Sequence, residues 1–88
     1  MNAAVKKVLL VEDEAIIAMS ESMILKDAGF DAVICTSGEE ALLTACSDPD
    51  ISLILMDIDL GEGMDGTETA EKILQKRDLP IIFLTSHT

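Results

Sequence analysis

Two short apolar runs, each ending in acidic residues, constrain this chain more than any other feature. Residues 8–11 lead directly into Glu12 and Asp13, and residues 53–56 lead directly into Asp57. Unbroken apolar runs of this length are typical of strands buried on both faces, as in a parallel sheet. Because ligands bind at the carboxyl ends of such strands, we expect the three acids to converge if the two strands are neighbours.

Three carboxylates in one pocket are unfavourable without compensation, because like charges raise one another's pKa values. A hard divalent cation would relieve the repulsion. Mg²⁺ suits a site of few carboxylates that also takes water and phosphate oxygens. The sequence therefore predicts Glu12, Asp13 and Asp57 as magnesium ligands.

Strand and helix patterns alternate along the chain. Strands are predicted at residues 5–11, 32–35, 51–56 and 81–84, and helices at residues 14–28, 38–46 and 67–76. This alternation implies right-handed crossovers and an α/β fold with a parallel sheet covered on both faces. At 88 residues, the chain is expected to form a single domain.

Turn and cap residues mark the ends of these helices. Gly29 is expected to stop the first helix. Ser37 and Glu40 match a capping box at the start of the second, and Asp65 with Glu68 repeats that logic at the third.

Two further groups of residues are predicted to be buried. Ala70, Ile73 and Leu74 form the apolar stripe of the third helix. Cys35 and Cys46 have no metal-ligand spacing, so both are expected to be buried free thiols, as in a reducing, cytoplasmic setting.

Charge and hydropathy exclude several functions. The chain has 17 acidic and 6 basic residues and a formal charge of −11. It lacks a basic patch for phosphates, so direct nucleic-acid binding is not expected, and an anionic membrane surface would repel it. No apolar stretch approaches the roughly 18 residues of a membrane span, and residues 1–7 do not resemble a secretory signal.

Four motifs, in order and at these separations, resemble the receiver domain of two-component response regulators over residues 8–88. They are Glu12-Asp13, Leu55-Met56-Asp57, Met64-Asp65-Gly66 and Pro80-Ile81-Ile82-Phe83-Leu84-Thr85. The resemblance implies a flavodoxin-like, doubly wound sheet with the strand order 2-1-3-4 and three helices.

The resemblance also implies a role for each site residue. Asp57 would accept a phosphoryl group from a sensor histidine kinase or a phosphotransfer protein, as an exposed carboxylate nucleophile. Asp13 would bind Mg²⁺ directly and Glu12 would assist through water. Asp59 would offer its backbone carbonyl to the metal, and Thr85 would hydrogen-bond the phosphoryl group. The module would be a phosphoacceptor and not an enzyme.

One departure from the family pattern bears on activity. The family has a fifth strand that ends in a phosphoryl-binding lysine, followed by a last helix, and no residue among these 88 matches that lysine. We therefore expect a receiver-like domain over residues 1–88 that lacks its C-terminal part (a fifth strand and two helices), with impaired phosphorylation. The strand at residues 81–84 would be an exposed sheet edge, which favours homo-oligomers.

Two other functions stay open from the sequence. Asp57 and Asp59 form an Asp-x-Asp motif after an apolar strand, which resembles phosphatases of the haloacid-dehalogenase-like type. That motif usually closes the first strand of its fold, whereas here it closes the third, and it leaves Glu12 and Asp13 unexplained. A chemically silent structural fragment is the other alternative.

Overall fold

The strands that end in acidic residues lie side by side at the centre of one parallel sheet. The computed structural model describes residues 5–84, with four strands in the order β2-β1-β3-β4. Their bounds are β1 (Lys7–Val11), β2 (Asp31–Cys35), β3 (Ile51–Asp57) and β4 (Ile81–Leu84). Each neighbouring pair is parallel. The predicted sheet and its strand order are confirmed.

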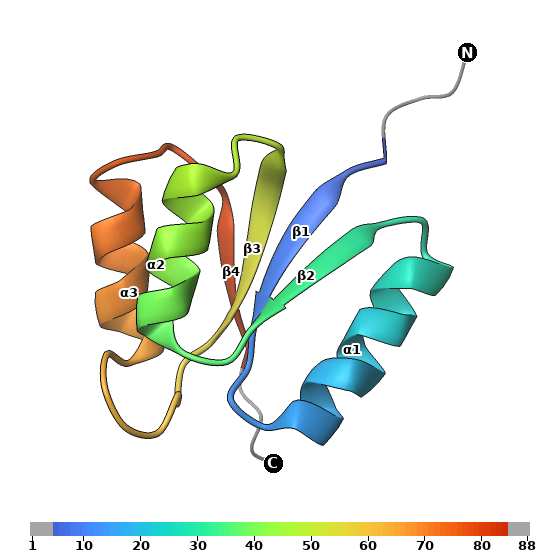
Figure 1. The fold of residues 1–88 in the computed structure, drawn as a ribbon, viewed down its shortest axis with the longest axis horizontal. Helices are drawn as coiled ribbons and strands as arrows, with labels where there is room; N and C mark the ends of the chain where they lie inside the picture. The colour runs from blue at the N-terminus through green and yellow to red at the C-terminus, as the bar shows by residue number, and fades with distance from the viewer. Residues whose placement is uncertain (1–4, 85–88) are drawn as a thin grey trace.

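Three helices cover this sheet in two outer layers. Helix α1 (Ala15–Asp27) lies on one face, and α2 (Gly38–Ser47) and α3 (Gly66–Leu74) lie together on the other face (Figure 1). This is the flavodoxin-like, doubly wound arrangement that the alternating pattern and the family resemblance predict. No helix within residues 5–84 has the length and apolar character that a membrane span requires.

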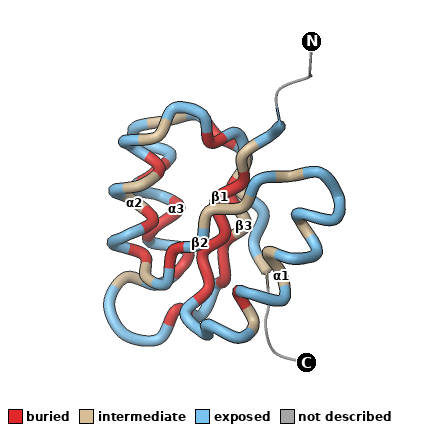
Figure 2. Tube along the Cα trace, turned by 45° about the vertical axis from the view of Figure 1, so that its right-hand side comes forward, coloured by how far each residue is buried: buried red, intermediate tan, exposed pale blue. Residues whose placement is uncertain are grey.

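Strand β1 is buried on both faces, as its unbroken apolar sequence predicts, whereas Leu53 and Leu55 on one face of β3 are only partly buried. Residues 8–11 of β1 have no exposed surface, and neither do Ile54 and Met56 of β3. Burial concentrates on these strands and on the inner sides of α2 and α3, whereas α1 is mostly exposed (Figure 2). The core of a chain with only two aromatic residues is thus aliphatic.

The predicted caps are present at α2 and α3. Ser37 Oγ accepts a hydrogen bond from the Glu40 N–H at 3.1 Å, and Asp65 Oδ1 accepts one from the Glu68 N–H at 2.8 Å. In a standard capping box the Glu40 side chain would accept from the N–H of the N-cap residue Ser37. Here its carboxylate accepts from the N–H of the preceding residue, Thr36, at 2.9 Å. These bonds satisfy backbone donors that have no partner inside a helix.

Two predictions of burial are wrong. Leu74 is 49% exposed, and the inner face of α3 includes fully buried Thr69 instead. The Thr69 hydroxyl donates to the Asp65 carbonyl at 2.7 Å, so the side chain packs inward with its polar atom satisfied. Cys35 is a buried free thiol as expected, whereas Cys46 is a free thiol on the exposed side of α2.

Arg77 joins the end of α3 to the turn between α2 and β3. Its Nη1 donates to the carbonyls of Ala45 and Asp48 at 2.8 and 3.0 Å. Its Nη2 donates to the carbonyls of Pro49 and Ile51 at 3.3 and 3.1 Å. One planar guanidinium thus satisfies four carbonyl oxygens near the end of a helix, which a lysine ammonium matches poorly.

We expect Arg77→Ala to lower the free energy of unfolding by about 2–3 kcal/mol, because it leaves partly buried carbonyls without donors. Urea denaturation measures this loss. The matched control is the exposed neighbour Lys76, whose alanine variant should change stability by no more than about 0.5 kcal/mol. Equal losses in the two variants would contradict this role for Arg77.

Candidate acidic site

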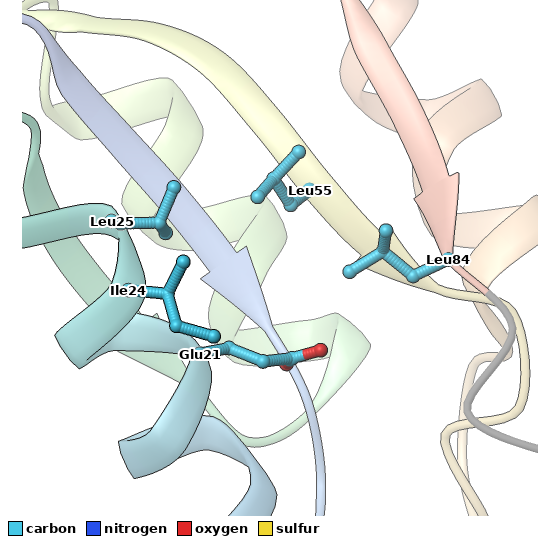
Figure 3. A pocket seen from close by; sticks show the side chains of 5 residues that line it. All are labelled: Glu21, Ile24, Leu25, Leu55 and Leu84. Carbon is cyan, nitrogen blue, oxygen red and sulfur yellow. The ribbon is translucent and has the colours of Figure 1, made fainter. Parts of the chain in front are cut away.

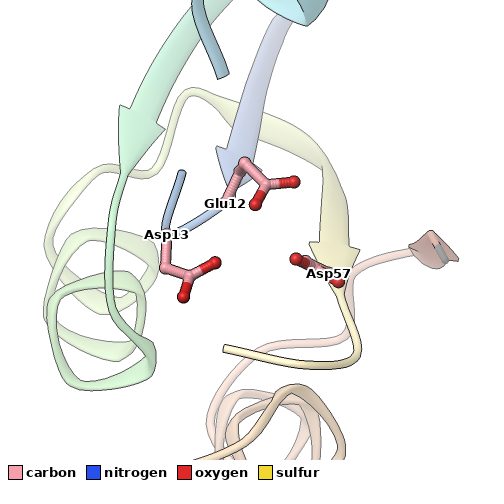
Figure 4. A group of neighbouring side chains, drawn as sticks. All are labelled: Glu12, Asp13 and Asp57. Carbon is pink, nitrogen blue, oxygen red and sulfur yellow. The ribbon is translucent and has the colours of Figure 1, made fainter. Parts of the chain in front are cut away.

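Register brings three carboxylates together at the carboxyl end of the sheet. Val11 of β1 pairs with Met56 of β3, so the residues that follow them, Glu12 and Asp57, lie next to each other. One carboxylate oxygen from each of Glu12, Asp13 and Asp57 lies within 4.8 Å of the others. Figure 4 shows the three side chains converging on one space. The predicted meeting of these acids is confirmed.

The environment of Glu12 changes its pKa. Its side chain is 1% exposed, and its Oε2 accepts a hydrogen bond from the Glu14 N–H at 3.2 Å. The pKa of Glu12 is raised to about 7, chiefly by burial. The nearby carboxylates of Asp57 and Asp13 add to the rise, and the hydrogen bond from the Glu14 N–H opposes it. Near neutral pH, Glu12 therefore holds a proton part of the time unless a cation replaces it.

Asp57 is buried, although the sequence predicted an exposed nucleophile. It is 1% exposed. Its Oδ1 accepts the Asp59 N–H at 3.2 Å, and its buried Oδ2 has no hydrogen-bond partner among the described residues. Asp57 is the last residue of the central strand β3. Helix α3 begins so close that a Cβ on Gly66 would collide with the Asp57 carbonyl.

The solvent side of the cluster is formed by Asp13. Asp13 is exposed, in contrast to Glu12 and Asp57. The loop after β3 passes close to it, since a Cβ on Gly61 would lie 3.1 Å from Asp13 Oδ2. Asp13 is therefore the member of the cluster that is open to solvent.

The arrangement fits a small divalent cation. An unpartnered buried carboxylate oxygen is costly, and the lone pairs of Asp57 Oδ2 are available to a cation or to a phosphorus atom. Few carboxylates, one of them facing solvent, are a donor set that Mg²⁺ accepts while it keeps water ligands.

The predicted roles of Asp59 and Thr85 do not follow from the side-chain geometry of the cluster. The Asp59 side chain organises its own turn, where Oδ1 accepts the Gly61 N–H at 3.3 Å. Its backbone carbonyl as a metal ligand stays a prediction. Thr85 lies outside the described residues, so its role also stays a prediction.

Glu21, an acid on α1 near the cluster, was not predicted from the sequence. It lines a cavity of about 170 Å³ whose other walls are apolar, formed by Ile24, Leu25, Leu55 and Leu84 (Figure 3). Glu21 Oε1 is buried without a hydrogen-bond partner among the described residues. Burial raises the pKa of Glu21, and the charge of Asp57 adds to this. The sequence gives little signal for this position, because apolar residues are spread around much of α1 and do not mark which side faces the sheet.

Comparison with known proteins gives this geometry a family. The family model described as the response regulator receiver domain matches residues 8–88. The transcriptional regulatory protein PdtaR of Mycobacterium tuberculosis is 38% identical over 88 residues, which cover 97% of this chain and 42% of that protein.

Solved structures agree. The N-terminal domain of a response regulator/sensory box/GGDEF 3-domain protein from Carboxydothermus hydrogenoformans is 46% identical, with a TM-score of 0.89, covering 94% of this chain and 66% of that one. A CheY-like receiver domain protein from Methanospirillum hungatei is 30% identical, with a TM-score of 0.88, covering 97% of this chain and 67% of that one.

The chain is short beside its relatives, since it spans 31% to 42% of the length of curated proteins such as PhyR, PdtaR and MtrA. Its match to the family model nevertheless extends over most of its length, and its strand order and acidic cluster agree with that match. The chain therefore belongs to the family of response regulator receiver domains of two-component systems.

Proposed function

We propose that this chain is a phosphoacceptor in which Asp57 takes a phosphoryl group with the help of Mg²⁺. Glu12, Asp13, Asp57 and the Asp59 carbonyl would hold the ion. The observation that supports this most is Asp57 itself, a buried nucleophile type with one oxygen bonded and the other without a partner, beside two more carboxylates. Family membership makes phosphoryl transfer the expected chemistry of such a group.

Several residues would each have a separate role in the phosphoryl transfer. The Asp59 N–H holds Oδ1 of Asp57 and so orients the carboxylate. Oδ2 then forms the new O–P bond while the P–N bond of a phosphohistidine breaks, and the leaving imidazole keeps the electron pair and takes a proton. When bound, Mg²⁺ would supply electrostatic neutralisation of the charge on the phosphoryl oxygens. Asp13, on the solvent side, would meet the incoming donor first.

Asp57→Asn tests the acceptor. With acetyl phosphate and Mg²⁺, we expect the native chain to gain at most one phosphoryl group, and Asp57→Asn to gain none, because an amide oxygen is a poor nucleophile. Intact-mass spectrometry measures the label. Asp50→Asn, which removes an exposed acid from the opposite end of the sheet, should label like the native chain. Unchanged labelling of Asp57→Asn would refute the assignment.

The same sample separates the alternative functions. Turnover of p-nitrophenyl phosphate that disappears in Asp59→Ala would favour a phosphatase of the Asp-x-Asp type. A chain that takes no phosphoryl group and shows no NMR response to Mg²⁺ at residues 12, 13, 57 and 59 would be chemically silent. The family match supports the phosphoacceptor over both.

Glu12→Gln tests the electrostatics of the site. A carboxyl with a pKa raised from 4.5 to about 7 by folding contributes stability below pH 4.5, and that contribution is lost as the pH rises towards 7. We therefore expect Glu12→Gln to be more stable than the native chain near pH 8 without metal, by about 1–3 kcal/mol, and this gain to vanish near pH 4.5.

Thermal unfolding monitored by circular dichroism across this pH range measures the difference. Because Mg²⁺ competes with the Glu12 proton, its affinity for the native chain should also weaken as the pH falls below about 7. If the Glu12→Gln variant is no more stable than the native chain at pH 8, then ionised Glu12 does not destabilise the folded state.

We propose a sensor histidine kinase or a phosphotransfer protein as the phosphoryl donor, with the cytoplasm as the compartment where they meet. The support is family membership and the chemistry of an acyl phosphate acceptor. The charge of −11 supports a cationic or metal-bridged contact and disfavours direct contact with nucleic acid.

We also propose that the chain forms homo-oligomers through β4. In the described sheet β4 has one neighbour, and Ile82 and Phe83 are 50% and 43% exposed. An apolar edge strand with unpaired backbone groups is a template for pairing with another chain. A second β4 would pair with these backbone groups and continue the sheet, placing its own side chains beside Ile82 and Phe83.

Phe83→Lys should shift the chain from dimer to monomer in light-scattering chromatography at micromolar concentration, because a lysine on the edge opposes strand pairing. The added cation lowers the net negative charge, so reduced association would not come from charge repulsion. Leu43→Lys on α2, where Leu43 is 72% exposed, is the matched control and should leave the mass unchanged. A native chain that is monomeric throughout would refute pairing through β4.

A further inference from the structure

The loop that joins β3 to α3, residues 58–65, lies against the acidic cluster on one side and against α2 on the other. On the cluster side, the Asp59 N–H bonds to Asp57 Oδ1, and Gly61 lies close to Asp13. Two of the three acids of the site therefore touch this loop. The conformation of the loop therefore shapes the space beside Asp13 and Asp57.

On the other side, Glu39 of α2 holds the loop. Glu39 Oε2 accepts a hydrogen bond from the Met64 N–H at 3.1 Å, across 25 positions of sequence. The carboxylate also fills the space above Gly63, where a Cβ would lie 2.9 Å from Oε2 and 3.1 Å from Oε1. Gly63 has a φ of +85°, a conformation that favours glycine, so the loop is built for this close approach.

Glu39 itself is well placed for the contact. It lies in the first turn of α2, where an acidic side chain interacts favourably with the helix dipole. Helix α2 is fixed by the buried Ala41 and Ala45 and by the Ser37 cap. The loop is thus bonded to a rigid element and not only to its own turn.

We propose that Glu39 is a positioning residue, which keeps the β3–α3 loop ordered beside the acidic cluster before a divalent cation binds. The inference rests on the proposed metal site. A loop that is already ordered spares the ion the entropic cost of ordering it, which raises affinity without a new ligand. Glu39 acts through the Met64 hydrogen bond and does not touch the ion.

Three substitutions separate this bond from the charge of Glu39. Glu39→Ala removes both the bond and the charge. Glu39→Gln keeps an acceptor oxygen of the same reach without the charge. Glu39→Asp keeps the charge and its favourable place at the helix start, but its arm is one methylene shorter. Glu62→Ala, at an exposed acid of the same loop, is the control for loss of charge alone.

Two measurements on ¹⁵N-labelled protein give the result, namely Mg²⁺ affinity from amide shifts and hydrogen exchange of the Met64 amide. We expect Glu39→Ala and Glu39→Asp to bind Mg²⁺ roughly 3- to 10-fold more weakly and to exchange the Met64 amide faster. Glu39→Gln and Glu62→Ala should stay within about twofold of the native chain in both respects.

Native affinity in Glu39→Ala or Glu39→Asp would overturn the inference. So would a loss in Glu39→Gln as large as in Glu39→Ala, since the charge and not the bond would then matter. Unchanged Met64 exchange in Glu39→Asp would refute the contact even if no metal binds. Failure of the native chain to bind Mg²⁺ would refute the metal site instead, which keeps the two claims distinguishable.

Discussion

The register of β1 on β3 holds three carboxylates together against their mutual repulsion, and the acidic site depends on that pairing. Two of the acids extend buried strands, so they cannot turn towards water to relieve the repulsion. The apolar contacts of residues 8–11 and of β3 supply the free energy that opposes it. Burial is the main cause of the raised pKa of Glu12, and the neighbouring carboxylates contribute to it; a cation is the simplest partner that relieves both effects.

Close backbone approaches then shape the surroundings of the acids. Gly66 lets α3 begin against the Asp57 carbonyl, and Gly38 lets α2 begin against Thr69, since a side chain on either glycine would collide. These contacts bring α2, α3 and the loop between β3 and α3 into one body beside the site. Glu39 belongs to that body, which is why an acid outside the cluster can influence the cluster through the loop.

Much of the fold follows from local sequence, because short apolar runs, caps and glycine stops are local signals. The parallel sheet and the convergence of Glu12, Asp13 and Asp57 were predictable from two apolar runs that end in acids. Long-range features were not. Cys46 and Leu74 lie on helix faces whose exposure depends on where neighbouring helices pack, and the Glu39 contact joins residues far apart in sequence. The close approach of α3 to the Asp57 carbonyl likewise joins elements that the strand pattern alone does not place together.

Mn²⁺ is a paramagnetic substitute for Mg²⁺, and its effect on amide NMR signals shows directly whether Glu12, Asp13 and Asp57 bind one cation. If the ends of β1 and β3 share one cation, low Mn²⁺ should broaden the amides of residues 12, 13, 57 and 59 first, and excess Mg²⁺ should restore them. The contrary results are broadening that begins at other acids, such as Asp48 and Asp50 at the opposite end of the sheet, and broadening that spreads evenly over the acidic surface. Either result would show that the ends of β1 and β3 do not form a specific cation site.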